Sequence, residues 1–98
     1  MRARFVLTPR ARADLDENWD YTAEQWGLDQ AEKYVRQLWS DIAAIADRPT
    51  LGRECADVRP GYRKYPSGSH GLFYRLSKSR LDVVRILHER MDHERHFP

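Results

Sequence analysis

The chain has 98 residues, of which 41% are hydrophobic and 11% aromatic, and its formal net charge is +2. This length allows one domain, residues 1–98, with a modest core, and the apolar content is too high for a disordered chain. No apolar run is long enough to span a membrane, and the first residues lack the apolar segment of a secretory signal. We therefore expect a folded cytosolic protein that is not inserted in a membrane.

The first predicted elements are a short strand and a long helix. Arg4–Leu7 reads "RFVL", which has the composition of a strand, and Thr8 followed by Pro9 is typical of a helix start. Gly27 is placed to end this helix in a left-handed conformation. Five residues recur at spacings of 4, 4, 3 and 4 and predict one buried helix face: Ala11, Leu15, Trp19, Thr22 and Trp26.

A second helix is predicted to start at a capping box formed by Asp29 and Glu32 and to end near Asp47. The short link between the two helices requires them to fold back on each other as an antiparallel hairpin. The apolar face of this helix has spacings of 4, 3, 4 and 3, and its members are Ala31, Val35, Leu38, Ile42 and Ile45.

Beyond Pro60 and Gly61 the pattern changes from helical to extended, and three strands are predicted at Tyr62–Tyr65, Ser69–Leu76 and Leu81–His88. A hairpin closed by Ser77–Arg80 pairs residues whose numbers sum to 157, so Arg75 lies opposite Asp82. On the Arg75 side this register places Phe73, Val84, Ile86 and His88. On the opposite side it places Leu72, Tyr74, Leu76, Leu81, Val83, Arg85 and Leu87.

These elements predict an α+β fold, in which an N-terminal strand and an antiparallel two-helix hairpin accompany a three- to four-stranded, mostly antiparallel sheet. Two helices can cover one face of such a sheet but hardly both. Because both faces of the predicted hairpin are apolar, we expect one apolar sheet face to need a protein partner.

Charge is divided between two parts of the sequence. Asp14–Asp47 carries nine acidic residues and two basic ones, whereas Arg59–Arg85 carries seven basic residues and one acid. The domain is therefore expected to have an acidic and a basic face. The basic segment contains no recognition helix or RNA-stacking motif, so docking of an acidic protein segment is favoured over sequence-specific DNA binding.

Some residues have no evident role in the core and are candidates for binding a partner. A Pro-Gly turn is preceded by Arg59 and followed by Tyr62, Arg63 and Lys64, and Trp39 lies off the apolar face of its helix. Arg75 is instead expected to pair with Asp82 across the sheet.

No cofactor or metal site is expected. His88, His93 and His96 lack the further ligands of a tetrahedral site at suitable spacing, and Cys55 lacks the electropositive surroundings of a nucleophile.

Several segments together resemble the ParE toxins of the RelE/ParE superfamily, and the resemblance covers nearly the whole chain. The signature consists of "RPGYR", "GSH", "FYR" and "DVVRILHERMD" in this order and spacing. It implies a toxin of a plasmid- or chromosome-borne toxin–antitoxin module that inhibits DNA gyrase. It also implies neutralisation by a ParD antitoxin, which lays its C-terminal segment across the toxin and carries a ribbon-helix-helix operator-binding fold. We expect the basic strand face and the C-terminal segment Met91 to Phe97 to contact gyrase, and the partner-binding residues to include Arg85, His88, Arg90 and Met91.

The same superfamily contains ribosome-dependent mRNA endonucleases of the RelE type, which is the alternative function. Such chemistry needs acid–base groups and cations at the scissile phosphate. The candidates in this sequence are Lys64, Arg75, Arg85, His88 and Glu89. Gly71 stands about where those enzymes place an Arg, and the chain ends without a catalytic Tyr, so we expect a toxin that acts by binding and has no catalytic residues. A third class is an inactive relative that serves only as co-repressor with its antitoxin.

Overall fold

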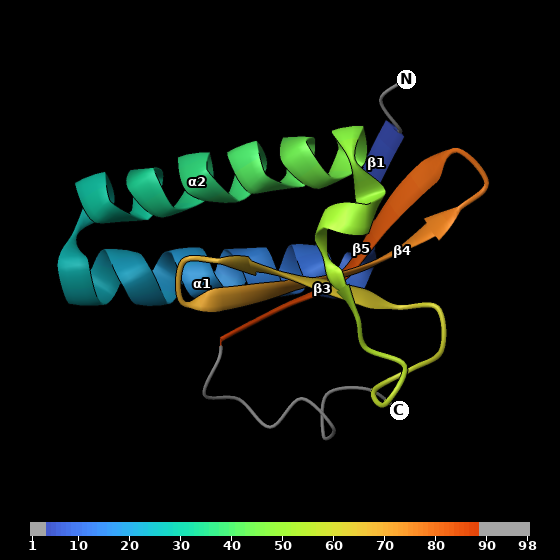
Figure 1. Cartoon of the computed structure of the whole chain (residues 1–98). Helices are drawn as coiled ribbons and strands as arrows, with labels where there is room; N and C mark the ends of the chain where they lie inside the picture. Colours follow the sequence, from blue (N-terminus) through green and yellow to red (C-terminus); the bar gives the residue numbers. More distant parts are fainter. Residues whose placement is uncertain (1–3, 89–98) are drawn as a thin grey trace.

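A computed structural model of the chain describes residues 4–88. One short strand precedes a helical hairpin, and the remaining strands follow it (Figure 1). The elements in chain order are β1 (Arg4–Leu7), α1 (Pro9–Trp26), α2 (Leu28–Asp47), the 3-10 turn η1 (Pro49–Leu51), β2 (Arg53–Glu54), β3 (Arg63–Ser67), β4 (His70–Ser77) and β5 (Arg80–His88).

Local signals set the start and end of α1 as predicted. The Thr8 hydroxyl accepts a hydrogen bond from the Ala11 amide at 3.2 Å, and Pro9 occupies the first turn. Gly27 ends the helix at a φ of 94°, a conformation that strongly favours glycine. The predicted capping box at Asp29 is wrong, because Gly27 joins the helices directly and α2 already begins at Leu28 without a side-chain cap.

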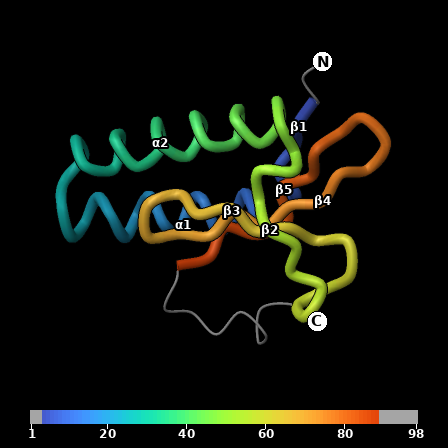
Figure 2. The backbone as a smooth tube through the Cα atoms, viewed as in Figure 1, coloured from blue at the N-terminus to red at the C-terminus, as the bar shows by residue number. Residues whose placement is uncertain are grey.

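The five strands form one sheet in the order β1-β5-β4-β3-β2, and the two antiparallel helices lie along one side of it (Figures 1 and 2). β1 runs parallel to β5, and the other neighbours are antiparallel. The α+β prediction is confirmed, with one strand more than expected. The additional strand is β2, whose two residues pair with Arg63 and Lys64 of β3.

The predicted register of the β4–β5 hairpin is confirmed from Tyr74–Val83 to Ser77–Arg80, including the pair Arg75 and Asp82. Lys78 makes the turn with a φ of 57°. A β-bulge between Phe73 and Tyr74 then shifts the pairing by one residue, so Phe73 lies opposite Arg85. Beyond the bulge the predicted faces are wrong, because one extra residue in β5 exchanges the sides of all later side chains.

The helices bury one face of the sheet, called here the helix face. Tyr74 lies at its centre, and its hydroxyl accepts from the Gly52 amide at 2.9 Å and donates to the Pro49 carbonyl at 2.6 Å. This core contains Ala11, Leu15, Leu38, Ile42, Ile45, Leu72, Tyr74, Leu81, Val83 and Ile86.

The opposite face of the sheet, called here the open face, holds a second and smaller cluster. Phe73, Val84 and Leu87 are buried there with Cys55, and Val58 and Tyr62 pack against them. The segment that joins β2 to β3 supplies the cover. The expectation that this apolar face stays exposed is therefore wrong for Phe73, Val84 and Leu87.

The two tryptophans of α1 differ in burial, although both were predicted to be in the core. Trp19 is half-buried, whereas Trp26 is 72% exposed. The helical hairpin extends past the end of the sheet (Figure 1), so the end of α1 has no strand beneath it. Helical spacing alone predicts a common face, but not how far that face is covered.

Candidate functional site

The basic residues predicted from the sequence gather mainly on the open face. Residues paired across a sheet point to the same side, so the register aligns Arg4 with Arg80, Arg53 with Lys64, and Lys64 with Phe73. Alternation along β4 and β5 adds Arg75 and keeps it on the side of Arg80 and Asp82. Each of the five strands thus contributes one cation to this basic face: Arg4, Arg53, Lys64, Arg75 and Arg80.

One half of the basic face lies near the β2–β3 connection. The Lys64 ammonium lies 5.5 Å from the centroid of the Phe73 ring, and the Arg59 guanidinium lies 6.0 Å from that of Tyr62. A Cβ on Gly71 would approach the Lys64 side chain to 2.7 Å, so glycine leaves room for the Lys64 stem. Three predicted partner-binding residues, Arg59, Tyr62 and Lys64, are thereby brought together.

Cys55 lies beneath this half of the basic face. Burial raises the pKa of its thiol, Asp57 raises it further, and the nearby Arg53 and Lys64 oppose the shift. A thiol whose pKa is raised is a poor nucleophile. Cys55 is buried with Phe73, Val84 and Leu87, so it serves as a packing residue in this cluster.

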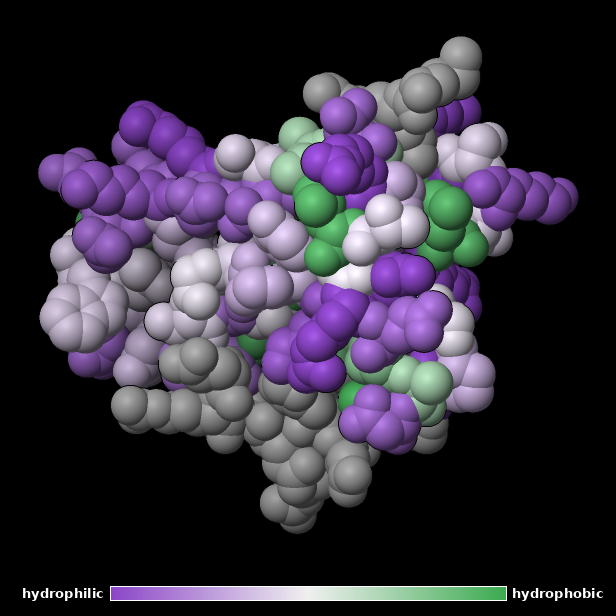
Figure 3. Space-filling view, in the orientation of Figure 1, coloured by the Kyte–Doolittle hydropathy of each residue, from purple (hydrophilic) through white to green (hydrophobic). Residues whose placement is uncertain are grey.

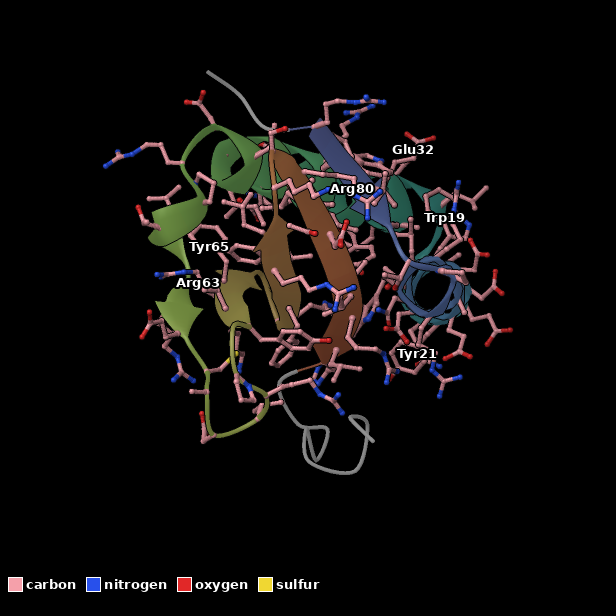
Figure 4. All side chains as sticks on the ribbon, turned by 90° about the vertical axis from the view of Figure 1, so that its right-hand side faces the viewer. Trp19, Tyr21, Glu32, Arg63, Tyr65 and Arg80 are labelled. Atoms are coloured by element: carbon pink, nitrogen blue, oxygen red, sulfur yellow. The ribbon has the colours of Figure 1, made fainter. Side chains whose placement is uncertain are left out.

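Arg63 lies on the helix face, because it is paired with Tyr74 in the register. It donates to the Gly52 carbonyl at 2.6 Å and to the Glu54 carboxylate at 3.4 Å. Arg63 stands at the β2 edge of the sheet, while Arg80 stands at the β1 edge (Figure 4). Arg63 therefore does not share a face with Lys64, and its hydrogen bonds fix it beside Gly52 and Glu54. Its predicted role in binding a partner stays a prediction.

Arg85 is buried, which contradicts its predicted role as a surface contact. Its Nε and Nη2 donate to the two carboxylate oxygens of Asp14 at 2.8 Å each, and both side chains are only 8% exposed. The Asp14 carboxylate also accepts from the Ile86 amide at 2.9 Å. The hydrogen bond to Asp14 raises the pKa of Arg85 despite the opposing effect of burial. Next to the bulge, Arg85 thus connects β5 to α1.

His88 lies in a groove between the helical hairpin and the turn from β3 to β4. The His70 ring lies 4.8 Å from Tyr34 and 5.3 Å from His88, measured between centroids. The groove has a volume of about 1120 Å³ and is also lined by residues of both helices, including Asn18 and Lys33. Burial raises the pKa of Tyr34 to about 12. Neither His70 nor Tyr34 was predicted as a site residue, because no pattern in the sequence indicates that these two side chains lie close together.

Trp39 is exposed at the other end of the helix face, as predicted. Its ring lies 5.9 Å from that of Phe5 on β1, and both side chains are more than one-third exposed. Leu76 on β4 is also exposed. In the view of Figure 3 the strongly hydrophobic residues form small separate areas, most of them on the half that holds the β4–β5 hairpin.

The residues proposed for nuclease chemistry do not converge. Lys64 lies on the open face, Arg75 donates to Asp82, and Arg85 is buried against Asp14. His88 is paired with His70 and lies on the helix face. Glu89, Arg90, Met91, His93 and His96 lie outside the described residues.

Neither a metal site nor a membrane segment was found in the part of the chain that the structure describes. Within residues 4–88, no group of three or more His, Cys, Asp or Glu side chains could hold a metal ion. None of the helices in this range is both long and apolar enough to cross a membrane.

Comparisons with known proteins identify the family. Residues 5–93 match the family described as the ParE toxin of the type II toxin–antitoxin system parDE. Toxin ParE1 of Mycobacterium tuberculosis is 50% identical over 98 residues, covering 99% of this chain and all of that protein. Toxin ParE1 of Caulobacter vibrioides is 42% identical over 93 residues, or 95% of this chain and 96% of the relative.

The fold agrees with this assignment. A chain from the solved structure "Chromosomal ParDE TA system from P. aeruginosa" superimposes with a TM-score of 0.77 at 20% identity, covering 89% of this chain and 96% of that one. A "YoeB/ParE toxin from Agrobacterium tumefaciens" gives a TM-score of 0.59 at 17% identity, with 87% and 96% covered. From its sequence relatives and its family match, this chain belongs to the ParE toxins of type II toxin–antitoxin systems, within the RelE/ParE superfamily.

Proposed function

We propose that this toxin acts by binding DNA gyrase, without catalysis, and that a ParD-like antitoxin neutralises it. The observation that carries the proposal is the separation of Lys64 and His88 on opposite faces of the sheet. General acid–base cleavage of a phosphodiester needs its proton-transfer groups within hydrogen-bond reach of one scissile phosphate. Two groups divided by the thickness of a sheet do not meet this condition.

Purified gyrase distinguishes a binding toxin from a ribonuclease. The wild-type toxin should inhibit supercoiling and should leave ribosome-bound message intact. His88→Gln preserves size and hydrogen bonding, so it should cost one contact at most, on the order of 1 kcal/mol, and inhibition should fall modestly. A ribonuclease that used His88 would lose about 10²- to 10⁴-fold in rate. Cleavage of message that disappears together with growth arrest in His88→Gln would reject the gyrase proposal.

The proposed antitoxin contact is the half of the basic face that contains Arg59, Tyr62 and Lys64. These side chains combine two cations with the half-buried aromatic ring of Tyr62, a mixture that suits an acidic segment with apolar anchors. The exposed pair Phe5 and Trp39 offers an additional apolar contact on the helix face.

Charge reversal tests this contact. Arg59→Glu combined with Lys64→Glu should slow association with the antitoxin and flatten its dependence on salt, because opposite charges steer encounter. The matched control reverses two exposed cations elsewhere, Arg36 and Arg48, and should leave the association rate nearly unchanged. Equal association rates for the two double variants at low salt would remove Arg59 and Lys64 from the interface.

A further inference from the structure

The other half of the basic face, at the tip of the β4–β5 hairpin, carries four cations. Arg4 lies beside Arg80 in the register of β1 with β5, and its amide donates to the Ser79 carbonyl at 3.3 Å. Arg75 comes from β4, and Lys78 forms the turn between the strands. We call the set Arg4, Arg75, Lys78 and Arg80 the hairpin-tip patch; all four residues are exposed.

One buried acid positions two of these cations. The Asp82 carboxylate is 2% exposed and accepts from Arg80 Nε at 2.8 Å and from Arg75 Nε at 3.3 Å. Arg80 Nη2 makes a longer contact of 3.4 Å with the same carboxylate. Both arginines remain about half exposed, at 50% and 56%. Asp82 thus holds two guanidinium groups in place while about half of each arginine side chain remains exposed.

The charge balance of the patch is strongly positive. Four cations and one acid give a net charge of +3, and the acid is already engaged by both arginines. A guanidinium whose orientation is fixed is well suited to a phosphate, because its donors match the oxygens of that group. The exposed hydroxyls of Ser77 and Ser79 flank the same turn and are common donors to phosphate.

We propose that the hairpin-tip patch binds the phosphate backbone of duplex DNA. Protein–protein interfaces are anchored by buried aromatic and apolar groups, and protein–DNA interfaces are more polar and more positive. The patch contains no aromatic residue, so it lacks the stacking platform with which proteins hold single-stranded RNA. Its donors reach phosphates and not base edges, so the contact reads no base sequence.

This inference goes beyond the proposed gyrase inhibition, because it concerns binding to DNA alone. The test measures fluorescence anisotropy of a labelled duplex of about 20 base pairs, with the purified toxin and without gyrase, over a range of salt concentrations. Each phosphate contact makes the slope of log affinity against log salt more negative by about 0.9. The loss of one contact should therefore lower the affinity at 0.1 M salt by about tenfold, relative to the affinity at about 1 M salt. The affinity should be equal for two duplexes of unrelated sequence.

Two variants keep the fold and change the patch. Lys78→Asn suits the left-handed turn, removes one charge, and should reduce the slope by about 0.9 and the affinity by about tenfold. Arg75→Lys with Arg80→Lys keeps cations beside Asp82 but loses the oriented guanidiniums, so the affinity should fall severalfold with little change in slope. Lys33→Asn, on the exposed side of α2, is the charge-matched control and should bind as the wild type does.

Equal weakening in Lys78→Asn and Lys33→Asn would overturn the proposal, because it would mean that net charge alone determines binding. Tighter binding of a poly-uridine RNA or a glutamate-rich peptide than of the duplex would also overturn it, in favour of an RNA or a protein ligand. Loss of duplex binding in Lys78→Asn with gyrase inhibition unchanged would support the DNA site and show that inhibition does not depend on it. A wild-type toxin that inhibits gyrase but does not bind duplex DNA would refute this inference alone.

Discussion

Breaking the buried pair between Asp14 and Arg85 should be among the most destabilising single changes in the chain. Asp14→Asn keeps the size of the side chain but removes its charge, and so leaves the Arg85 guanidinium buried without a counter-charge. In the native structure the Asp14 carboxylate accepts three hydrogen bonds, two from Arg85 at 2.8 Å and one from the Ile86 amide at 2.9 Å. Removal of one partner of such a pair costs about 3–5 kcal/mol.

This cost is large for a domain of 98 residues, whose free energy of unfolding is expected to be about 5–15 kcal/mol. At about 4–8 °C per kcal/mol, the melting temperature should fall by roughly 12–40 °C. Urea and thermal unfolding followed by circular dichroism measure the effect. Asp16→Asn, two residues away on the exposed side of α1, is the matched control and should change the free energy of unfolding by less than about 0.5 kcal/mol.

A second substitution separates the charge from the packing. Asp14→Leu with Arg85→Met replaces the pair by apolar side chains and should recover much of the stability lost in Asp14→Asn, because the uncompensated charge is gone. A loss below about 1 kcal/mol in Asp14→Asn would show that water reaches Arg85 and would refute the buried-pair reasoning.

Three further predictions concern single side chains. Tyr74→Phe removes the partner of the buried Gly52 amide and should lower the free energy of unfolding by about 1–3 kcal/mol, measured by urea titration. Trp26→Ser should change it by less than about 0.5 kcal/mol, because Trp26 is exposed; a core-like loss of several kcal/mol would mean that this side chain is covered. The pKa of Tyr34 is raised to about 12 in the fold, above its usual value of 10, so folding stability should fall as the pH rises from 10 to 12. Tyr34→Phe should lose less stability than the wild type over this window, and identical pH profiles would contradict the assignment.

Predictions from the sequence succeeded where short-range signals decide the structure. The cap at Thr8, the proline at position 9 and the glycine at position 27 lie within a few residues of the structure that they control. The turn at Lys78 likewise fixes the hairpin register for several residues on each side. Such features depend on local backbone chemistry, which a single sequence contains.

The errors arose where distant segments decide the structure. β2 has two residues and exists only because β3 lies beside it, so no periodicity reveals it. Asp14 and Arg85 are 71 residues apart, and each alone looks like an ordinary surface charge. The run "LDVVRIL" is apolar on both sides, and it gives no indication of which residue of β5 has no partner across the bulge.

The bulge also bears on the choice between a binding toxin and an enzyme. If the register that sums to 157 continued along the whole hairpin, His88 would share the open face with Phe73, and therefore with Lys64. A basic lysine and a histidine would then lie on one side of the sheet, as acid–base cleavage of RNA requires. The extra residue in β5 instead turns His88 toward the helices, where it meets His70 in the groove, and places Leu87 in the cluster on the open face. A one-residue irregularity in one strand thus separates Lys64 from His88, two of the five candidate catalytic groups. Both histidines among residues 4–88 then lie on the helix face, away from the cations of the open face.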